Sequence, residues 1–320
     1  MSVLNKSANL LAQDFLQNTT RYRCEVATFP RMTLIDCGAH TLGSLAAGLQ
    51  LARICLGGAA EVTLQSSELG HGIAVYSDAP LAACLGSQYA GWQMSYGKYF
   101  AMASGPMRAI LAEETIFEEY PHLVEQSPVA VGALETRKLP TEEVCQAILA
   151  ELPDTVEQCV LAVAPAASIA GNIQVVARCL ETALHKLHAL NFPLDTIVSG
   201  IGWAPLPPVA KDEISAIGRT NDAILYGGKV DLYVQAKEKD QAAQLDELIA
   251  EIGPRVPAGS SPDYGRPFVE IFQRYNGNFY ELDPLLFSPA QISFNNLHTG
   301  RVSSFGERNG AVLQRSFASE

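Results

Sequence analysis

The feature that most limits the fold is an alternation of two sequence periods in the second half of the chain. Short apolar runs typical of strands alternate with stretches in which apolar residues recur at helical spacing. The predicted strands cover 129–134, 159–165, 196–202 and 229–235, and the predicted helices cover 141–151, 168–187, 211–226 and 238–252. This alternation predicts βαβ units and therefore an α/β fold.

The first half is predicted to be an α/β domain of its own. A helical pattern over 3–19 precedes two strand-like runs around the turn at Pro30 and Arg31. The polar, acidic segment 113–128 then separates this half from the alternating region. We therefore predict mixed sheets in two α/β domains, with approximate boundaries at 1–125 and 126–255 or with discontinuous domains as the alternative, followed by a C-terminal segment at 256–320.

The charge of the chain argues against a nucleic-acid or membrane partner. The formal net charge of the 320 residues is -12, and the sequence has no basic stripe that could follow a phosphate backbone. The N-terminus has no basic stretch followed by an apolar one, and no uninterrupted apolar run reaches about 20 residues. We therefore expect a cytoplasmic protein.

The cysteines and histidines suggest neither disulfides nor a metal site. The seven cysteines are odd in number, form no CxxC pair and lie mostly in apolar runs, which is typical of buried reduced thiols. His185 and His188 lie three residues apart, but the six histidines show no established metal-ligand spacing. The phosphate-loop, GxGxxG, HExxH and GxSxG motifs are absent as well.

One predicted helix carries a second, polar stripe beside its apolar face. In "SIAGNIQVVARCLETALHKL" (168–187), the stripe consists of Gln174, Arg178, Glu181 and His185. Arg178 and Glu181 are three residues apart and can pair. A surface ion pair is the plain interpretation, worth about a few tenths of a kcal/mol. However, small residues precede the helix and leave open space and free backbone N–H groups for a ligand.

Three further segments combine polar side chains with turn residues. "AIGRTNDAILYGG" (216–228) holds four consecutive polar residues, "GIGWAPLPPVAKD" (200–212) holds three prolines, and "ASGPMRA" (103–109) holds a Gly-Pro pair. Helix capping, a stiff connector and a helix start explain them as well as ligand contacts do.

Taken together, "SIAGNIQVVARCLET", "PPVAKDEISAIGRTNDAILYGG" and "ASGPMRAI" resemble methenyltetrahydromethanopterin cyclohydrolase. The resemblance covers nearly the whole chain and thins after about residue 285. It implies hydrolysis of the cyclic methenyl group of a tetrahydromethanopterin carrier to the N5-formyl compound, without a bound cofactor or metal. It also implies a homotrimer with the pterin in a pocket between two α/β domains. The C-terminal segment is expected to pack back on that pocket.

The resemblance places the catalytic residues on Arg178 and Glu181. A methenyl bridge is an electrophilic amidinium cation, so the attack of water needs positioning and charge control more than a strong base. As a carboxylate, Glu181 can orient water, accept its proton and return it to the departing ring nitrogen. Arg178 lowers the pKa of such a carboxylate, whereas desolvation raises it.

Other polar residues are candidates for substrate binding. Those expected at the amide and amino edge of the pterin are Asn172, Gln174, Asn221 and Asp222, with Arg219 in the same run. Lys98 and Lys211 are candidates for an anionic tail of the carrier. Whether the carrier is methanopterin or its dephosphorylated relative stays open.

Two other functions stay open from the sequence. A non-catalytic pterin-binding protein would need the pocket but not the Arg178 and Glu181 pair. A formyl transferase would need a second substrate site for the acceptor.

Overall fold

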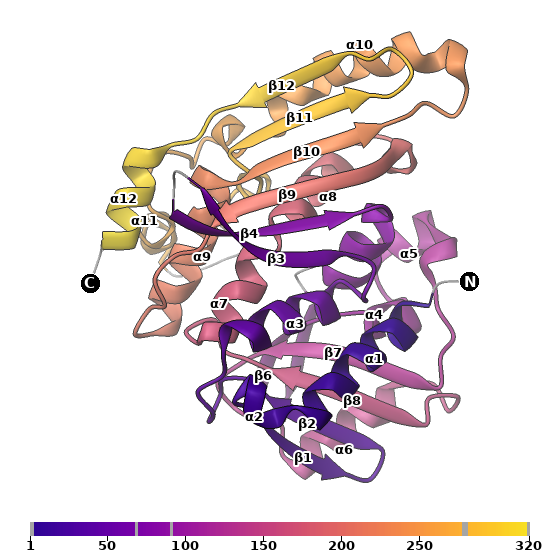
Figure 1. Cartoon of the computed structure of the whole chain (residues 1–320), viewed down its shortest axis with the longest axis vertical. Coiled ribbons are helices and arrows are strands. Elements are labelled where there is room, and N and C mark those ends of the chain that lie inside the picture. The colour runs from indigo at the N-terminus through magenta and orange to yellow at the C-terminus, as the bar shows by residue number, and fades with distance from the viewer. Residues whose placement is uncertain (1–2, 68–69, 90–91, 277–280, 319–320) are drawn as a thin grey trace. The chain divides into compact units, whose positions relative to one another are not determined.

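The chain folds into two compact units, each with a six-stranded mixed sheet (Figure 1). The computed structural model describes residues 3–67, 70–89, 92–276 and 281–318. Unit 1 comprises Met1–Val62 and Ala82–Gln174, and unit 2 comprises Thr63–Leu81 and Val175–Glu320. The α/β class and the mixed sheets are thereby confirmed.

The helices and strands have the following bounds. The α-helices are α1 (Leu4–Gln17), α2 (Thr19–Tyr22), α3 (Leu45–Cys55), α4 (Met107–Leu111), α5 (Thr115–Glu119), α6 (Glu142–Glu151), α7 (Ile169–Val176), α8 (Cys179–Ala189), α9 (Glu213–Gly227), α10 (Ala242–Ile252), α11 (Phe268–Arg274) and α12 (Gly310–Ala318), and Leu81–Gln88 is a π-helix. The strands are β1 (Glu25–Phe29), β2 (Met32–Asp36), β3 (Glu61–Ser67), β4 (Gly70–Ser77), β5 (Trp92–Tyr96), β6 (Tyr99–Ser104), β7 (Val129–Glu135), β8 (Gln158–Val163), β9 (Ile197–Pro205), β10 (Lys229–Val234), β11 (Gln291–Asn296) and β12 (Val302–Gly306). Short 3-10 turns lie at Pro121–Leu123, Leu194–Thr196, Lys239–Gln241, Gly253–Arg255, Ala258–Ser260 and Pro284–Leu286.

The sheet of unit 1 has parallel strands at its centre and antiparallel strands at its edges. The strand order is β1-β2-β8-β7-β6-β5, in which β2, β8 and β7 are parallel. The predicted unit of strand 129–134, helix 141–151 and strand 159–165 is confirmed as β7, α6 and β8. The carboxyl ends of the three parallel strands meet at one edge, where open α/β sheets bind their ligands.

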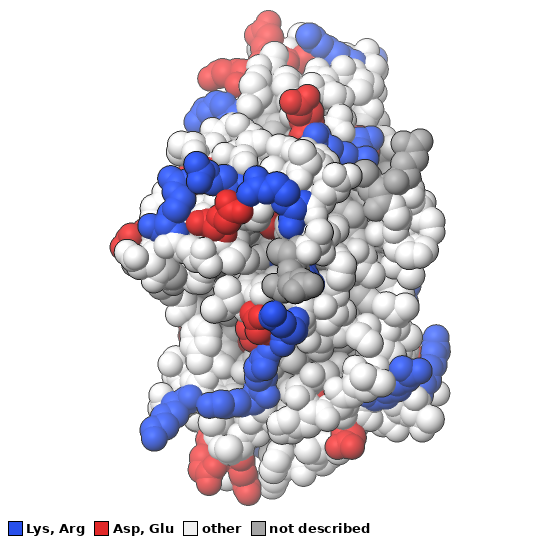
Figure 2. Space-filling view, turned by 90° about the vertical axis from the view of Figure 1, so that its left-hand side faces the viewer, with Lys and Arg blue, Asp and Glu red and all other residues white. Residues whose placement is uncertain are grey.

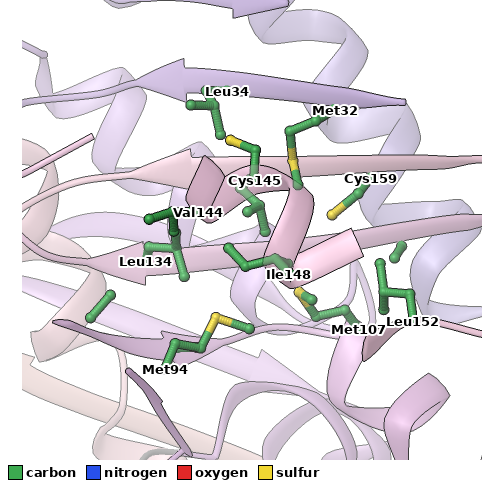
Figure 3. Close-up of a cluster of buried hydrophobic side chains, with 14 of the residues drawn as sticks. Met32, Leu34, Met94, Met107, Leu134, Val144, Cys145, Ile148, Leu152 and Cys159 are labelled. Carbon is green, nitrogen blue, oxygen red and sulfur yellow. The ribbon is translucent and has the colours of Figure 1, made fainter. Parts of the chain in front are cut away.

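One face of this sheet is buried under α4 and α6. Figure 3 shows the side chains of β2, β5, β7 and β8 that meet those of the two helices, several of them sulfur-containing, such as Met32, Met107 and Cys145. The opposite face is buried under α1 and α3. All seven cysteines are free and buried, which confirms the prediction of buried thiols.

The sheet of unit 2 has the order β12-β11-β10-β9-β4-β3, and only β10 and β11 are parallel among the pairs with a described register. In β10, Val230, Leu232 and Val234 are buried, whereas the alternate residues are half-buried. Strands with one face on a core alternate in this way. Helices α8, α9 and α10 pack against the strands of this sheet.

Three sequence predictions are corrected by the structure. The chain does not divide at 125/126 and 255/256, because β7 and β8 complete the first sheet while β4 and the last strands join the second. Strands 196–202 and 229–235 form an antiparallel pair rather than a parallel one, since hydrophobic period does not report strand direction. The predicted single helix 168–187 is two helices, α7 and α8.

The surface matches the low content of charged residues. On the face in Figure 2, acidic and basic side chains are interspersed in small groups among uncharged ones. Within the described ranges, no helix is long and apolar enough to span a membrane.

Candidate active site

Arg178 and Glu181 lie at the start of α8. The chain leaves the α7 geometry at Arg178, whose backbone N–H donates to Val175 O at 3.0 Å and whose φ and ψ are -84° and 2°. Arg178 thereby becomes the residue before α8, and Glu181 becomes the third residue of its first turn. A carboxylate in a first helical turn is stabilised by the helix dipole. Both side chains are buried, with 9% and 2% of their surface exposed.

Gly202 of β9 lets the start of α8 approach the strand closely. A Cβ atom on Gly202 would lie 2.8 Å from the backbone nitrogen of Leu180 and 3.0 Å from its Cβ. The Cys179 thiol also donates to Trp203 O at 3.4 Å. The first turn of α8 therefore rests directly on the strand backbone, so the glycines in "GIGW" serve close packing rather than a loop.

Asn172 and Gln174, both predicted to bind substrate, are buried on α7 with 4% exposure each. The Gln174 amide nitrogen donates to Oε2 of Glu135 at 2.9 Å. Glu135 is half-buried at the carboxyl end of β7. The sequence analysis missed this glutamate, although it is the first charged residue after an apolar strand and so marked the strand end.

The neighbouring strand ends of unit 1 form tight backbone loops. After β2, Asp36 accepts hydrogen bonds from the N–H groups of Gly38, Ala39 and His40 at 2.7 to 2.9 Å. After β8, Ser168 caps α7 by accepting from the N–H of Gly171 at 3.0 Å. The predicted small-residue entry into α7 is thus a capped helix start at the carboxyl edge of the sheet.

The predicted binding run 219–222 lies on α9 without interrupting it. Asp222 is fully buried and accepts a hydrogen bond from the N–H of Phe268 at 2.8 Å, and burial raises its pKa to about 7. Asn221 donates to Ile217 O at 2.8 Å, and Arg219 donates to Pro208 O at 3.4 Å. These bonds brace α9 and its neighbours, so contact of the three side chains with a pterin stays a prediction.

The two lysines predicted for the carrier tail belong to different units. Lys98 is exposed in the turn between β5 and β6 of unit 1, and Lys211 is exposed just before α9 of unit 2. Their role stays a prediction. His185, the last member of the polar stripe, is a neutral side chain at pH 7, because burial lowers its pKa to about 4.

Comparison with known proteins places the chain in a family. The sequence model of the family described as "Cyclohydrolase (MCH)" matches residues 3–317. The chain belongs to the methenyltetrahydromethanopterin cyclohydrolase (MCH) family. The family predicted from the sequence is therefore confirmed.

Relatives of this cyclohydrolase family are similar over almost their whole length. The methenyltetrahydromethanopterin cyclohydrolase of Rhodopirellula baltica is 43% identical, over 98% of this chain and 94% of the relative. That of Methylobacillus flagellatus is 39% identical, over 98% and 95% of the two chains. That of Methanospirillum hungatei JF-1 is 40% identical, over 89% and 88%.

The burial of Glu181 places a carboxylate where it can take part in proton transfer. Within the part of the chain that the structure describes, no three His, Cys, Asp or Glu side chains are grouped to hold a metal ion. That the reaction proceeds without a metal stays a prediction of the resemblance. Glu181, at the start of α8 and almost fully shielded from water, can act on a proton in a site of low dielectric constant.

Proposed function

We propose that Glu181 and Arg178 catalyse the cyclohydrolase reaction on 5,10-methenyl-tetrahydromethanopterin, giving the N5-formyl compound. The observation that carries this proposal is the burial of Glu181 in the first turn of α8, three residues after the buried Arg178. Charged side chains are seldom buried so completely, and buried ionisable groups cluster at functional sites, which supports a functional role.

The reaction moves a proton three times, and one carboxylate can perform two of these transfers. Water attacks the amidinium carbon while Glu181 accepts one of its protons. The second proton leaves as the carbonyl forms, the bond from carbon to one ring nitrogen breaks, and Glu181 returns its proton to that nitrogen. The net products are the formyl compound and one proton. The negative charge of Glu181 also stabilises the cationic substrate.

Arg178 controls the charge of the carboxylate in this proposal. A guanidinium near Glu181 favours its ionised form and holds its orientation, because the planar donor fork matches a carboxylate. A lysine keeps the charge but loses the fork. Arg178→Lys is therefore expected to reduce kcat. Full activity of that variant would contradict the proposal that Arg178 orients the carboxylate of Glu181 and controls its charge.

The resemblance extends the proposal to the assembly. The pterin is taken to bind in a pocket to which both units contribute, and the C-terminal segment 256–320 is taken to pack on it. The homotrimer is tested by sedimentation equilibrium, which would give about three times the chain mass of 34.4 kDa.

The decisive experiment follows the loss of the methenyl chromophore in the presence of the purified protein. Wild type should consume methenyl-tetrahydromethanopterin far faster than the spontaneous rate and leave methenyl-tetrahydrofolate almost untouched. Glu181→Gln is isosteric and should lower kcat about 100-fold or more with little change in binding. Activity without any added acceptor argues for hydrolysis rather than formyl transfer. Binding without turnover by the wild type would indicate a binding protein.

A further inference from the structure

A second carboxylate stands at the carboxyl edge of the unit 1 sheet, held by a buried amide. Gln174 is 4% exposed and lies between two partners. Its Nε2 donates to Oε2 of Glu135 at 2.9 Å, and its Oε1 accepts from the Cys55 thiol at 4.0 Å. A carboxylate only accepts hydrogen bonds, so the amide nitrogen must face it and the orientation of the amide is fixed. Gln174 therefore holds the Glu135 carboxylate in one position.

The register of the strands shows where this carboxylate lies. Asp36, Val163 and Leu134 are level across the parallel strands β2, β8 and β7. Glu135 follows Leu134 and so stands at the edge where open α/β sheets bind ligands. In the sequence only six residues separate Gln174 from Glu181.

Asp36, the other carboxylate at this edge, has a different function. Its two oxygens accept from three backbone N–H groups of the loop that follows, so it shapes that loop. Glu135 is held by a side-chain amide instead. A carboxylate has sites for about four hydrogen bonds, so a bond from Gln174 is compatible with donors from a ligand.

We infer that Glu135 recognises the pterin ring of the substrate, by accepting hydrogen bonds from its exocyclic amino group and the adjacent ring N–H. These two donors point in the same direction and match the two oxygens of one carboxylate, as a guanidinium does. Gln174 is a positioning residue that keeps Glu135 in the plane of the ring. This inference rests on the proposed function, since it assigns part of the same substrate.

The test compares kinetics of Glu135→Gln and a matched control with those of wild type. The edge of the pterin is bound equally in the ground state and in the transition state. Loss of the contact between this edge and Glu135 therefore raises KM and leaves kcat within about threefold of the wild-type value. The expected rise in KM is about 10- to 100-fold, as for loss of a charged hydrogen-bond partner. Glu157→Gln, which removes an exposed carboxylate of the same unit, should keep the wild-type KM.

The ratio of the binding constants of two competitive inhibitors distinguishes ligand recognition by Glu135 from a purely structural role of this residue. In 6-methyllumazine a carbonyl oxygen replaces the amino group of 6-methylpterin. Wild type should bind 6-methylpterin at least about tenfold more tightly than 6-methyllumazine, because the carbonyl oxygen of the lumazine would face the carboxylate of Glu135. Glu135→Gln should bind the two within about threefold of each other. Gln174→Met keeps the carboxylate of Glu135 but removes the hydrogen bond that positions it, so this variant should raise KM about three- to tenfold. It tests the inference if Glu135→Gln does not fold.

The outcomes separate the inference from the proposed function. An active wild type that binds the two inhibitors equally, or a Glu135→Gln variant that lowers kcat with KM unchanged, would overturn the role of Glu135 and leave the cyclohydrolase reaction intact. Absence of turnover by the wild type would instead remove the proposed function itself.

Discussion

The glycine at position 202 offers the sharpest test of how the fold places the catalytic pair. A Cβ atom there would lie 2.8 Å from the Leu180 nitrogen, whereas ordinary contacts begin near 3.4 Å. The opposing atoms belong to a helix backbone that no rotamer change can move. In Gly202→Ala, α8 must therefore retreat from β9 by about half an ångström, or the strand must bend.

The magnitude follows from this displacement. Overpacking of this kind costs about 1–3 kcal/mol of folding free energy, which lowers Tm by a few degrees in a chain of this size. Glu181 is the residue next to Leu180, so it moves with the helix. Because a misplacement of about 1 Å can reduce a rate about 100-fold, we expect kcat to fall about 10- to 100-fold.

Gly200→Ala is the matched control. Its Cβ would meet Leu180 Cδ1 at 2.8 Å and Leu232 Cδ2 at 3.2 Å, which are ends of flexible side chains. Both variants should be assayed for hydrolysis of the methenyl substrate and for thermal unfolding. Gly200→Ala should keep kcat within about threefold of wild type. The reasoning fails if Gly202→Ala folds with wild-type Tm and kcat.

Two further predictions concern buried groups. Burial raises the pKa of Asp222 from 3.8 to about 7, so the folded state binds the proton more tightly than the unfolded state does. The free energy of unfolding should therefore be greatest below about pH 3.8 with respect to this group, and should fall as the pH rises to about 7. Asp222→Asn should flatten this slope in denaturant titrations, and an unchanged slope would contradict the assignment. Burial also raises the pKa of Cys159 and Cys179 to about 12, so a thiol reagent should label the seven cysteines of the native protein only at the rate of unfolding. Fast labelling of the native protein would show that a thiol is accessible.

Local sequence patterns determined those parts of the protein that depend on neighbouring residues. The alternation of apolar periods was sufficient for β7, α6 and β8, because a βαβ unit is built from consecutive elements. The runs around Arg178, Glu181 and Asp222 resembled one family strongly enough to identify it. The apolar surroundings of the cysteines were sufficient to predict burial.

Only the tertiary structure decided the features that join distant residues. The chain leaves its helical path at Arg178, where Cys179 of α8 meets Trp203 of β9 across 24 residues. Glu135 meets Gln174 across 39 residues, and Asp222 meets Phe268 across 46. Hydrophobic period records which face of an element is buried, but not which partner buries it or in which direction that partner runs. For this reason the sequence indicated Arg178 and Glu181, whereas the close contact of Gly202 with α8 and the position of Glu135 could be recognised only from the packing.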